Sequence, residues 1–379
     1  ATFRGRSRAA AFGVWGAVIS GAAAVGPLAG GALTQYASWP WIFLVNLPLG
    51  VVILVAAAFT VRESRGAGRG EGLDVVGVLL SAGGFGVCVY AVIEGTSLGP
   101  WMVALLVAGL GIVGMFVWWE RARARRGAAV LLDIGLFRLR TFSWGNVTAG
   151  TVAVEEFAIV FVLPLCLVNA LGMSVMGAGL VLAAMALGAF LSGASARHLA
   201  ARLGPTGVVV LGLGLEVAGV IVLTLLLRPD APGWLVALPL VVYGLGLGLA
   251  SAQLTGTVLR DVPRAESGQG SATQSTVRQL GSALGTALSG AALSLALAFT
   301  LPPALRGLPG VDAASLVDST RSSTGTDIAV LRATGGSADL VSALSSGFTD
   351  ATRVALAVAA AFLVVGLAGA LRLRRVAAR

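Results

Sequence analysis

The sequence predicts an all-α integral membrane protein, and three observations support this fold class. Hydrophobic residues make up 57% of the 379 residues and charged residues 11%, whereas soluble domains average about 45–50% and about 25%. The mean hydropathy is +0.92. The apolar residues are gathered into runs of about 20, which is the length that an α-helix needs to cross about 30 Å of hydrocarbon.

Ten such runs are bounded by charged or turn residues, and each predicts one transmembrane helix. They cover residues 11–33, 41–61, 75–93, 101–119, 142–168, 175–196, 206–227, 234–254, 281–300 and 352–371. Glycine accounts for 53 residues, which in a membrane protein favours helices that pack backbone against backbone. Gly244, Gly246 and Gly248, in the eighth run, are interpreted as such a packing feature.

The basic residues are all arginines, 26 in number, and the formal net charge is +9. If the ten spans alternate, 21 of the 26 arginines fall on one face of the membrane. The other face receives Arg228, Arg306, Arg321, Arg332 and Arg353. Because cytoplasmic loops collect arginine, we expect a multi-pass protein of the plasma (inner) membrane with both termini cytoplasmic. The charge therefore indicates topology in a lipid bilayer, and no nucleic-acid partner is expected.

Two connecting segments differ from short turns. Residues 301–350 are rich in Ser, Asp and Gly, a composition that predicts an exposed or partly disordered outer loop. Residues 121–140 hold an apolar stretch between arginine clusters, which fits either an interfacial helix on anionic headgroups or a solvated loop.

The strongest motif lies in the first span, where Gly13 is followed by Gly26, Pro27, Gly30 and Gly31. Small residues on one helical face allow a second helix to approach closely. Pro27 removes a backbone donor and loosens the helix. The motif therefore predicts a deformable, tightly packed interface.

This GPLAGG segment, followed by SWPWIFLVNLPLG, resembles the fifth and sixth helices of the major facilitator superfamily. More narrowly, it is similar to the fourteen-helix drug/proton antiporter branch. The residues that match the branch's antiporter motif are Gly13, Gly26, Pro27, Gly30 and Gly31. Ala22 replaces the second glycine of that motif, and Pro40 stands where the branch usually has arginine.

The resemblance implies a major facilitator fold in which the ten spans are helices five to fourteen of an original fourteen. Residues 1–70 would be the last two helices of the N-terminal six-helix half. Residues 71–141 would be a central extra pair with a basic inner loop, and residues 142–379 the complete C-terminal half. We expect a fragment of a transporter whose cavity lies between the two halves, with the missing helices one to four as partners.

Three acidic residues lie deep inside predicted spans, namely Glu155, Glu156 and Glu216. An acidic side chain at mid-bilayer costs at least ~2.5–3.5 kcal/mol on insertion scales, so each is a functional candidate. Adjacent helical residues point about 100° apart, so Glu155 and Glu156 are not expected to face one cavity. Proton or substrate handling is the functional hypothesis, and hydrogen bonding between helices is the alternative.

Other polar residues in or beside the spans are weaker candidates for substrate contact, because buried amides more often bridge helices. They are Asn146, Tyr243, Gln253 and Gln274. Arg278 is expected to snorkel to the interface, or to pair with a lipid phosphate, Glu266 or Asp261.

No catalytic constellation emerges from the sequence, so an enzyme is not expected. His198 is the single histidine and lies in an inner loop, which argues against a metal site or a Ser/His/Asp triad. The chain has no lysine for a P-loop, and we expect no cofactor.

The resemblance implies a proton-coupled antiporter that moves small amphipathic substrates by alternating access. The alternatives are a non-transporting truncated or split membrane subunit, and a major facilitator carrier for a different small solute. A membrane-embedded enzyme is a weaker possibility.

Overall fold

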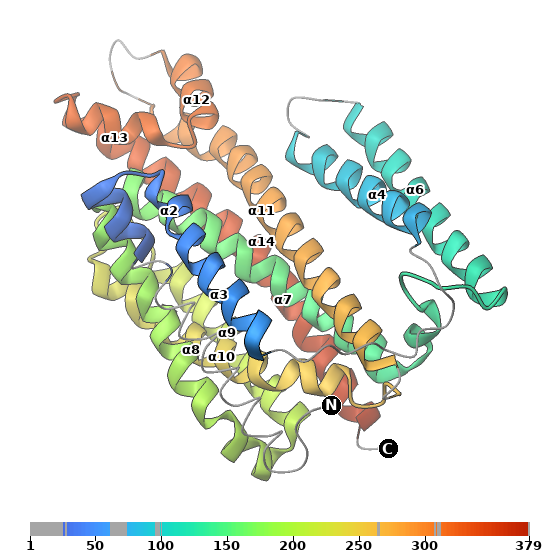
Figure 1. Ribbon diagram of the computed structural model, residues 1–379. Coiled ribbons are helices and arrows are strands. Elements are labelled where there is room, and N and C mark those ends of the chain that lie inside the picture. The colour runs from blue at the N-terminus through green and yellow to red at the C-terminus, as the bar shows by residue number, and fades with distance from the viewer. Residues whose placement is uncertain are drawn as a thin grey trace.

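The computed structural model describes residues 26, 29–60, 74–94, 99, 101–263, 266–306, 308 and 312–377, and every regular element in these ranges is helical (Figure 1). The first elements are η1 (Leu33–Ala37), α2 (Trp41–Leu44), α3 (Asn46–Thr60), α4 (Val75–Ile93), α6 (Trp101–Arg125) and η2 (Ile134–Arg138). The next are α7 (Arg140–Leu165), η3 (Cys166–Ala170), α8 (Val175–Leu203), α9 (Pro205–Leu226) and α10 (Gly233–Val258). The last are α11 (Ser267–Ala304), α12 (Ala313–Ser322), α13 (Thr326–Ala333) and α14 (Ala338–Ala377).

Within the described residues, nine helical stretches are long and apolar enough to cross a membrane. They confirm nine of the ten predicted spans. The remaining one, residues 11–33, lies mostly outside the described residues. Several helices are longer than their apolar runs: α11 has 38 residues, which is about 57 Å at about 1.5 Å per residue. Its ends therefore extend beyond the thickness of the hydrocarbon core.

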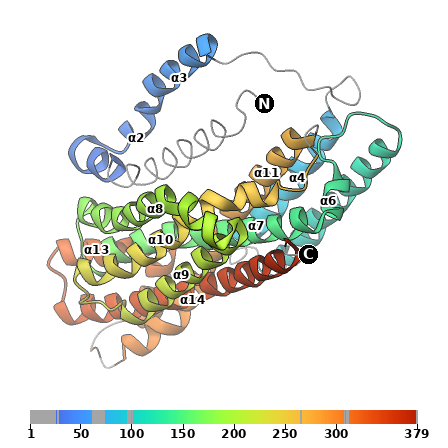
Figure 2. The same ribbon diagram turned by 90° about the horizontal axis from the view of Figure 1, so that it is seen from below.

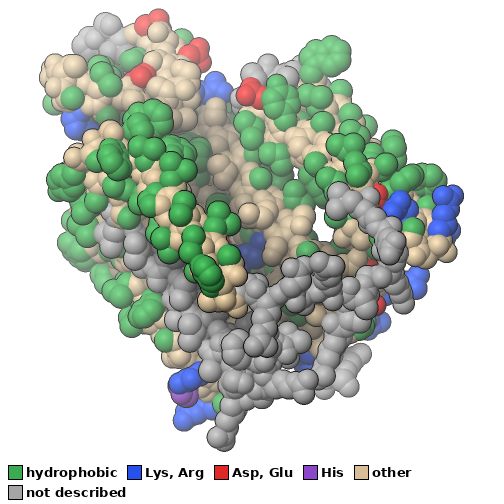
Figure 3. Space-filling model, in the orientation of Figure 1, with side chains coloured by type: hydrophobic (Ala, Val, Ile, Leu, Met, Phe, Trp, Pro, Cys, Tyr) green, Lys and Arg blue, Asp and Glu red, His purple; other side chains and the backbone are tan. Residues whose placement is uncertain are grey.

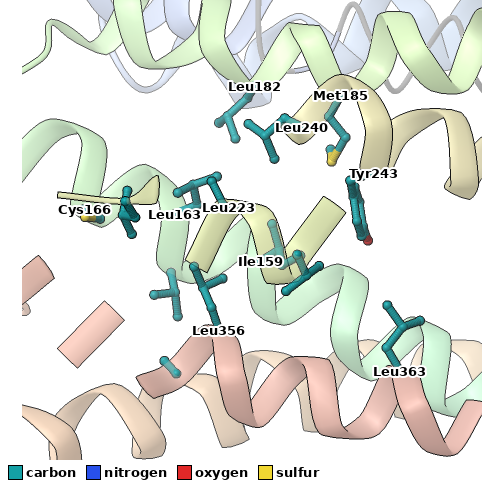
Figure 4. Close-up of a cluster of buried hydrophobic side chains, with 14 of the residues drawn as sticks. Ile159, Leu163, Cys166, Leu182, Met185, Leu223, Leu240, Tyr243, Leu356 and Leu363 are labelled. Carbon is teal, nitrogen blue, oxygen red and sulfur yellow. The ribbon is translucent and has the colours of Figure 1, made fainter. Parts of the chain in front are cut away.

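Six long helices, α7, α8, α9, α10, α11 and α14, form one bundle (Figure 1). Helix α10 packs against both α8 and α9, while α7 packs against α11 and α14. Each helix is apolar around most of its circumference, so it can bury one face in the bundle and leave another for lipid. Ile159 and Leu163 of α7, Leu240 of α10 and Leu356 of α14 are almost completely buried in this core (Figure 4).

Glycines bring α10 close to its neighbours. A Cβ atom on Gly246 would lie 2.7 Å from the backbone nitrogen of Glu216 on α9. On the other side of α10, a Cβ atom on Gly188 of α8 would lie 2.5 Å from the carbonyl oxygen of Val241. No larger side chain fits at either position without moving the helices apart. The interpretation of the α10 glycines as a packing feature is confirmed.

The α4 and α6 helices form a separate pair, which packs against α11 of the bundle (Figure 1). Helix α3 has a different environment, because none of the apolar stretch in Trp41–Thr60 is buried inside the chain. Figure 2 shows α3 standing away from the bundle, and in Figure 3 hydrophobic side chains cover its outer surface. The hydrogen bond from the backbone N–H of Met176 to Gln35 Oε1, 3.0 Å long, joins η1 to α8.

The sequence predicts an exposed or partly disordered outer loop at residues 301–350. The described part of that segment is mostly helical, and many of its side chains are exposed. It continues α11 to Ala304, forms α12 and α13, and begins α14 at Ala338. The side chain of Asp312 caps α12 by accepting the N–H of Ala314 at 3.2 Å. Buried Ile328 anchors α13 to the bundle. A few apolar anchors are enough to fold a segment whose average composition is polar.

The segment between α6 and α7 is held against the protein. Helix α6 continues to Arg125, and a single 3₁₀ turn, η2, precedes α7. Leu136 of η2 is buried, and Phe137 makes an edge contact with Phe142 of α7 at a ring distance of 5.2 Å. No long helix forms between Arg125 and η2, and the segment is anchored to the protein through Leu136 and Phe137.

Candidate functional site

The three predicted acids lie inside the six-helix bundle. Glu155 and Glu156 follow each other on α7, and Glu216 is on α9. The side chains of Glu155 and Glu216 have no exposed surface, whereas the side chain of Glu156 is 21% exposed. An apolar surrounding makes a charged carboxylate costly unless it is paired, so the partners of each acid decide what it can do.

Glu155 is linked to α10. The hydroxyl of Tyr243 donates a hydrogen bond to Glu155 Oε2 at 3.0 Å, and Tyr243 is itself almost completely buried. In Figure 4 the Tyr243 hydroxyl lies at the far end of the ring from α10. The second oxygen, Glu155 Oε1, is buried without a hydrogen-bond partner. The sequence-based candidate Tyr243 therefore contacts one of the acids directly.

Glu156 is linked to α11. Its Oε2 lies 3.3 Å from Nη2 of Arg278, and the Arg278 side chain is 36% exposed. The acidic partner of Arg278 is therefore Glu156, and not Glu266 or Asp261 as the sequence suggested. The reason is that α11 begins at Ser267, before the predicted start at residue 281, which places Arg278 beside α7 rather than at a helix end.

The two glutamates diverge as helical geometry requires. Glu155 bonds to α10 and Glu156 to α11, as expected for adjacent residues that point about 100° apart. Two adjacent positions of α7 thereby join two different helices, one through a neutral phenol and one through a cation. A change in the charge of α7 would affect both contacts.

Glu216 has the least compensation of the three acids. Both of its carboxyl oxygens are buried without a hydrogen-bond partner. It packs against Gly246 of α10 and lies within the electrostatic field of Glu155 and Glu156. A charged carboxylate without a donor is costly in such an apolar surrounding.

The remaining polar candidates make other contacts. Asn146 Nδ2 donates to the carbonyl of Phe142 on its own helix at 2.9 Å. Gln274 Nε2 donates to Thr255 Oγ1 at 3.1 Å, and Gln253 is partly buried. None of these amides shares a hydrogen bond with the acids in the described part of the chain.

The glycine motif of the first span is described only in part. Gly13 and Pro27 lie outside the described residues. A Cβ atom on Gly26 or Gly30 would meet no atom within 4 Å, and one on Gly31 would lie 3.5 Å from the carbonyl oxygen of Val175. No other described part of this chain therefore packs closely against Gly26 or Gly30, where the motif predicts a helix contact.

Sequence reasoning missed two features. One is Arg278 as the partner of Glu156. The other is a pocket of about 530 Å³ between the end of α13 and the start of α14, lined in part by Arg332 and Ser345. Arg332 Nη2 donates to the carbonyl of Ala170 at 2.7 Å and to Ser345 Oγ at 3.1 Å. No group of three metal-ligating side chains converges within the described residues.

The structure is a bundle of apolar, membrane-length helices. Two of its acids contact a tyrosine and an arginine on neighbouring helices, an arrangement typical of membrane transport proteins. The chain belongs to the Major Facilitator Superfamily, whose family profile matches residues 1–286. This family is one of transporters.

Curated relatives support the same conclusion. The chain is 31% identical over 340 residues to "Uncharacterized MFS-type transporter Rv1250" of Mycobacterium tuberculosis, which covers 83% of the chain and 54% of that protein. It is 31% identical over 376 residues to "Multidrug resistance protein Stp" of the same species, covering 96% and 68%. It is 31% identical over 305 residues to "Probable actinorhodin transporter" of Streptomyces coelicolor, covering 76% and 51%. The chain thus spans about half to two thirds of these relatives.

Proposed function

We propose that the protein is part of a proton-coupled antiporter that exports small amphipathic compounds across the plasma membrane by alternating access. The observation that carries the proposal is the pairing of adjacent acids on α7 with two different helices, through Tyr243 and Arg278. The multidrug resistance and antibiotic-transporter names of similar proteins support the choice of substrate class.

Glu156 is the proposed coupling residue. It is partly exposed and ion-paired with Arg278, so a proton or a cationic substrate can reach it more readily than the fully buried Glu155. Protonation removes its negative charge and weakens the attraction to Arg278, which loosens α7 from α11. A cationic substrate binds the charged carboxylate of Glu156 and displaces its proton to water, so proton and substrate exclude each other at this residue.

Glu155 and Glu216 have supporting roles in this proposal. Tyr243 can donate to Glu155 whether the carboxyl is charged or neutral, so the α7–α10 contact persists while Glu156 changes state. Glu216 interacts electrostatically with Glu155, so a change in the charge of either acid affects the other. Asn146 and Gln253 remain proposed substrate contacts on α7 and α10.

The division of the chain is also part of the proposal. The six-helix bundle of residues 142–379 would be one complete half, residues 71–141 the central pair, and residues 1–70 the end of the other half. Helices one to four would complete the transport cavity by packing on Gly13, Gly26, Pro27, Gly30 and Gly31. The distribution of arginines supports cytoplasmic termini.

The test is proton-driven transport in proteoliposomes that contain the full-length transporter and a fluorescent lipophilic cation. We expect Glu156→Gln and Glu155→Gln to lower gradient-driven accumulation by at least about tenfold, equivalent to about 1.4 kcal/mol. Substrate counterflow without a proton gradient should persist in both variants. Asp230→Asn, an exposed acid outside the bundle, is the matched control. Unchanged accumulation in both glutamate variants would rule out the assignment of coupling to these residues.

A second candidate is a non-transporting truncated or split subunit that requires another chain. The unburied apolar stretch of Trp41–Thr60 favours it. Transport by this chain alone, compared with transport by a chain that also carries the four preceding helices, separates the two candidates. A carrier for a different small solute would show proton-dependent transport but no accumulation of the lipophilic cation.

A further inference from the structure

A second buried acidic pair lies outside the six-helix bundle, where α4 begins and α6 ends. Asp74 is 6% exposed at the N-cap of α4, and Glu120 of α6 has no exposed surface. The two residues are 46 positions apart in the chain, but the antiparallel packing of α4 and α6 brings them together. Nothing in the proposed transport cycle uses them.

Asp74 is well provided with donors. Its Oδ1 accepts the backbone N–H of Gly77 at 2.9 Å and the indole N–H of Trp119 at 3.0 Å. Its Oδ2 lies 3.3 Å from Nε of Arg123. Burial raises the pKa of Asp74, but the hydrogen bonds and the positive charge outweigh this effect and leave its pKa below the ordinary value. Asp74 is therefore the charged member of the pair.

Glu120 has one satisfied oxygen and one unsatisfied oxygen. Its Oε2 accepts the backbone N–H of Leu132 at 3.1 Å. Its Oε1 is buried without a hydrogen-bond donor. Oδ2 of Asp74 is also buried without a hydrogen-bond donor, although it forms the ion pair with Arg123. A buried acceptor without a donor costs about 1–3 kcal/mol, so the two facing oxygens require an explanation.

The two unsatisfied oxygens point at the same place. A Cβ atom on Gly77 would lie 2.5 Å from Glu120 Oε1 and 2.7 Å from Asp74 Oδ2. Only glycine leaves room for both carboxyl groups here. The two oxygens are therefore at most 5.2 Å apart, and two charged carboxylates at that distance in a buried site repel each other unless a proton neutralises one of them.

We infer that Asp74 and Glu120 bind one proton between them, carried by Glu120 and donated from Oε1 to the Asp74 carboxylate, as a site separate from the α7 acids. The proton comes from water and returns to water, and no other co-reactant is needed. This assignment does not depend on the proposed coupling role of Glu156.

The charged groups around the site are few among the described residues. Arg123 of α6 is the cation that contacts the pair, and it pairs with Asp74. In the segment leading to η2, Asp133 accepts from the N–H of Gly135 instead. From α11 the neighbouring group is the neutral Gln269, whose Nε2 donates to the carbonyl of Val130 at 3.1 Å. The proton on Glu120 thus determines whether the pair carries one negative charge or two.

The site controls a junction between two parts of the fold. Glu120 holds the Leu132 N–H, and the same segment is tied to α11 through Val130 and Gln269. Loss of the proton places two negative charges beside each other and favours separation of α4 from α6. That movement releases the segment that connects the α4–α6 pair to α7. The segment is therefore held in place when the site is protonated and released when it is not.

Hydrogen–deuterium exchange of the full-length protein in lipid nanodiscs tests this inference. We expect the protection of the peptide that contains Leu132 to fall by at least about tenfold between about pH 6 and about pH 9, after correction for intrinsic exchange. Glu120→Gln should keep constant protection, because the amide oxygen still accepts from Leu132. Asp74→Asn should remove the fall in protection, because the negative charge that repels Glu120 is lost.

Asp133→Asn is the matched control, since it alters an acid in the same segment that does not contact the pair. The protection of its Leu132 peptide should fall with pH as it does in the native protein. Unchanged exchange of α7 peptides shows that each variant is folded. Constant protection in the native protein, or a fall that persists in Glu120→Gln, would overturn the assignment.

Discussion

Glu155 and Asp74 are both buried acids, yet they receive their hydrogen bonds from different kinds of donor. Glu155 has one neutral donor, the hydroxyl of Tyr243. Asp74 has a backbone N–H, an indole N–H and the guanidinium of Arg123. The α4–α6 site therefore fixes the charge of Asp74, whereas the single neutral donor at Glu155 leaves the charge of that acid free to change. Burial alone does not identify an acid that can exchange protons; the donors around it do.

The largest expected effect comes from forcing α9 away from α10 beside Glu216. Gly246→Val should lower the free energy of unfolding by about 3 kcal/mol or more, because the new side chain overlaps the α9 backbone. The measurement is thermal unfolding in detergent. Gly214→Val on α9 is the control, since a Cβ atom there meets nothing within 4 Å. Equal destabilisation by both substitutions would contradict the described α9–α10 contact.

The next largest effect concerns the fixed charge of Asp74. Asp74→Asn should cost about 1.5–3 kcal/mol near neutral pH, because the hydrogen bonds and the Arg123 contact lose their ionic component. Thermal unfolding of the variant and the native protein gives the difference.

The pH dependence of that difference has a definite sign. Because the folded-state pKa of Asp74 is lowered, its stabilisation is present above the unfolded-state pKa of about 3.9 and is lost as the pH falls through the folded-state value. The difference between native protein and variant should be constant from about pH 5 to pH 6 and shrink below about pH 4. A difference that grows on acidification would contradict the assigned charge.

A smaller effect is expected where the donor is neutral. Tyr243→Phe keeps the ring but removes the donor to Glu155, so it should cost about 1 kcal/mol. Tyr90→Phe on α4 is the control, because Tyr90 is 54% exposed. If Tyr243→Phe cost as much as Asp74→Asn, the contrast between the two sites would be lost.

The smallest effect is expected at an exposed pair outside both sites. Arg228 and Asp230 lie 3.5 Å apart, with side chains 59% and 81% exposed. Asp230→Asn should change stability by less than about 0.5 kcal/mol, because solvent screens the pair. A shift of unfolding temperature comparable to that of Tyr243→Phe would show that burial is not the deciding variable.

Apolar run length was sufficient to predict the nine described spans, because a membrane helix must be about 20 residues long. It could not predict where the helices end. The polar residues of α11 before residue 281 are helical because they contact neighbouring elements, as Gln269 does with Val130. Likewise, α12 and α13 fold through contacts such as that of Arg332 with Ala170, which composition does not reveal.

The acids of the candidate site could be predicted because a charged residue in an apolar run is conspicuous. Their partners could not, because Arg278 and Glu156 are 122 residues apart in the chain. Glu120 was not predicted as a buried acid, because it lies at the end of an apolar run beside a cluster of arginines, where a solvated side chain is the ordinary expectation. Only tertiary packing buries it.

The most direct test of the central claim is proton release on substrate binding. A fluorescent lipophilic cation is added to the full-length transporter in weakly buffered detergent solution, and the pH change is recorded with the native protein and with Glu156→Gln. We predict proton release by the native protein and little or none by the variant, although the variant still binds the cation. Equal proton release by both proteins would contradict the assignment of coupling to Glu156.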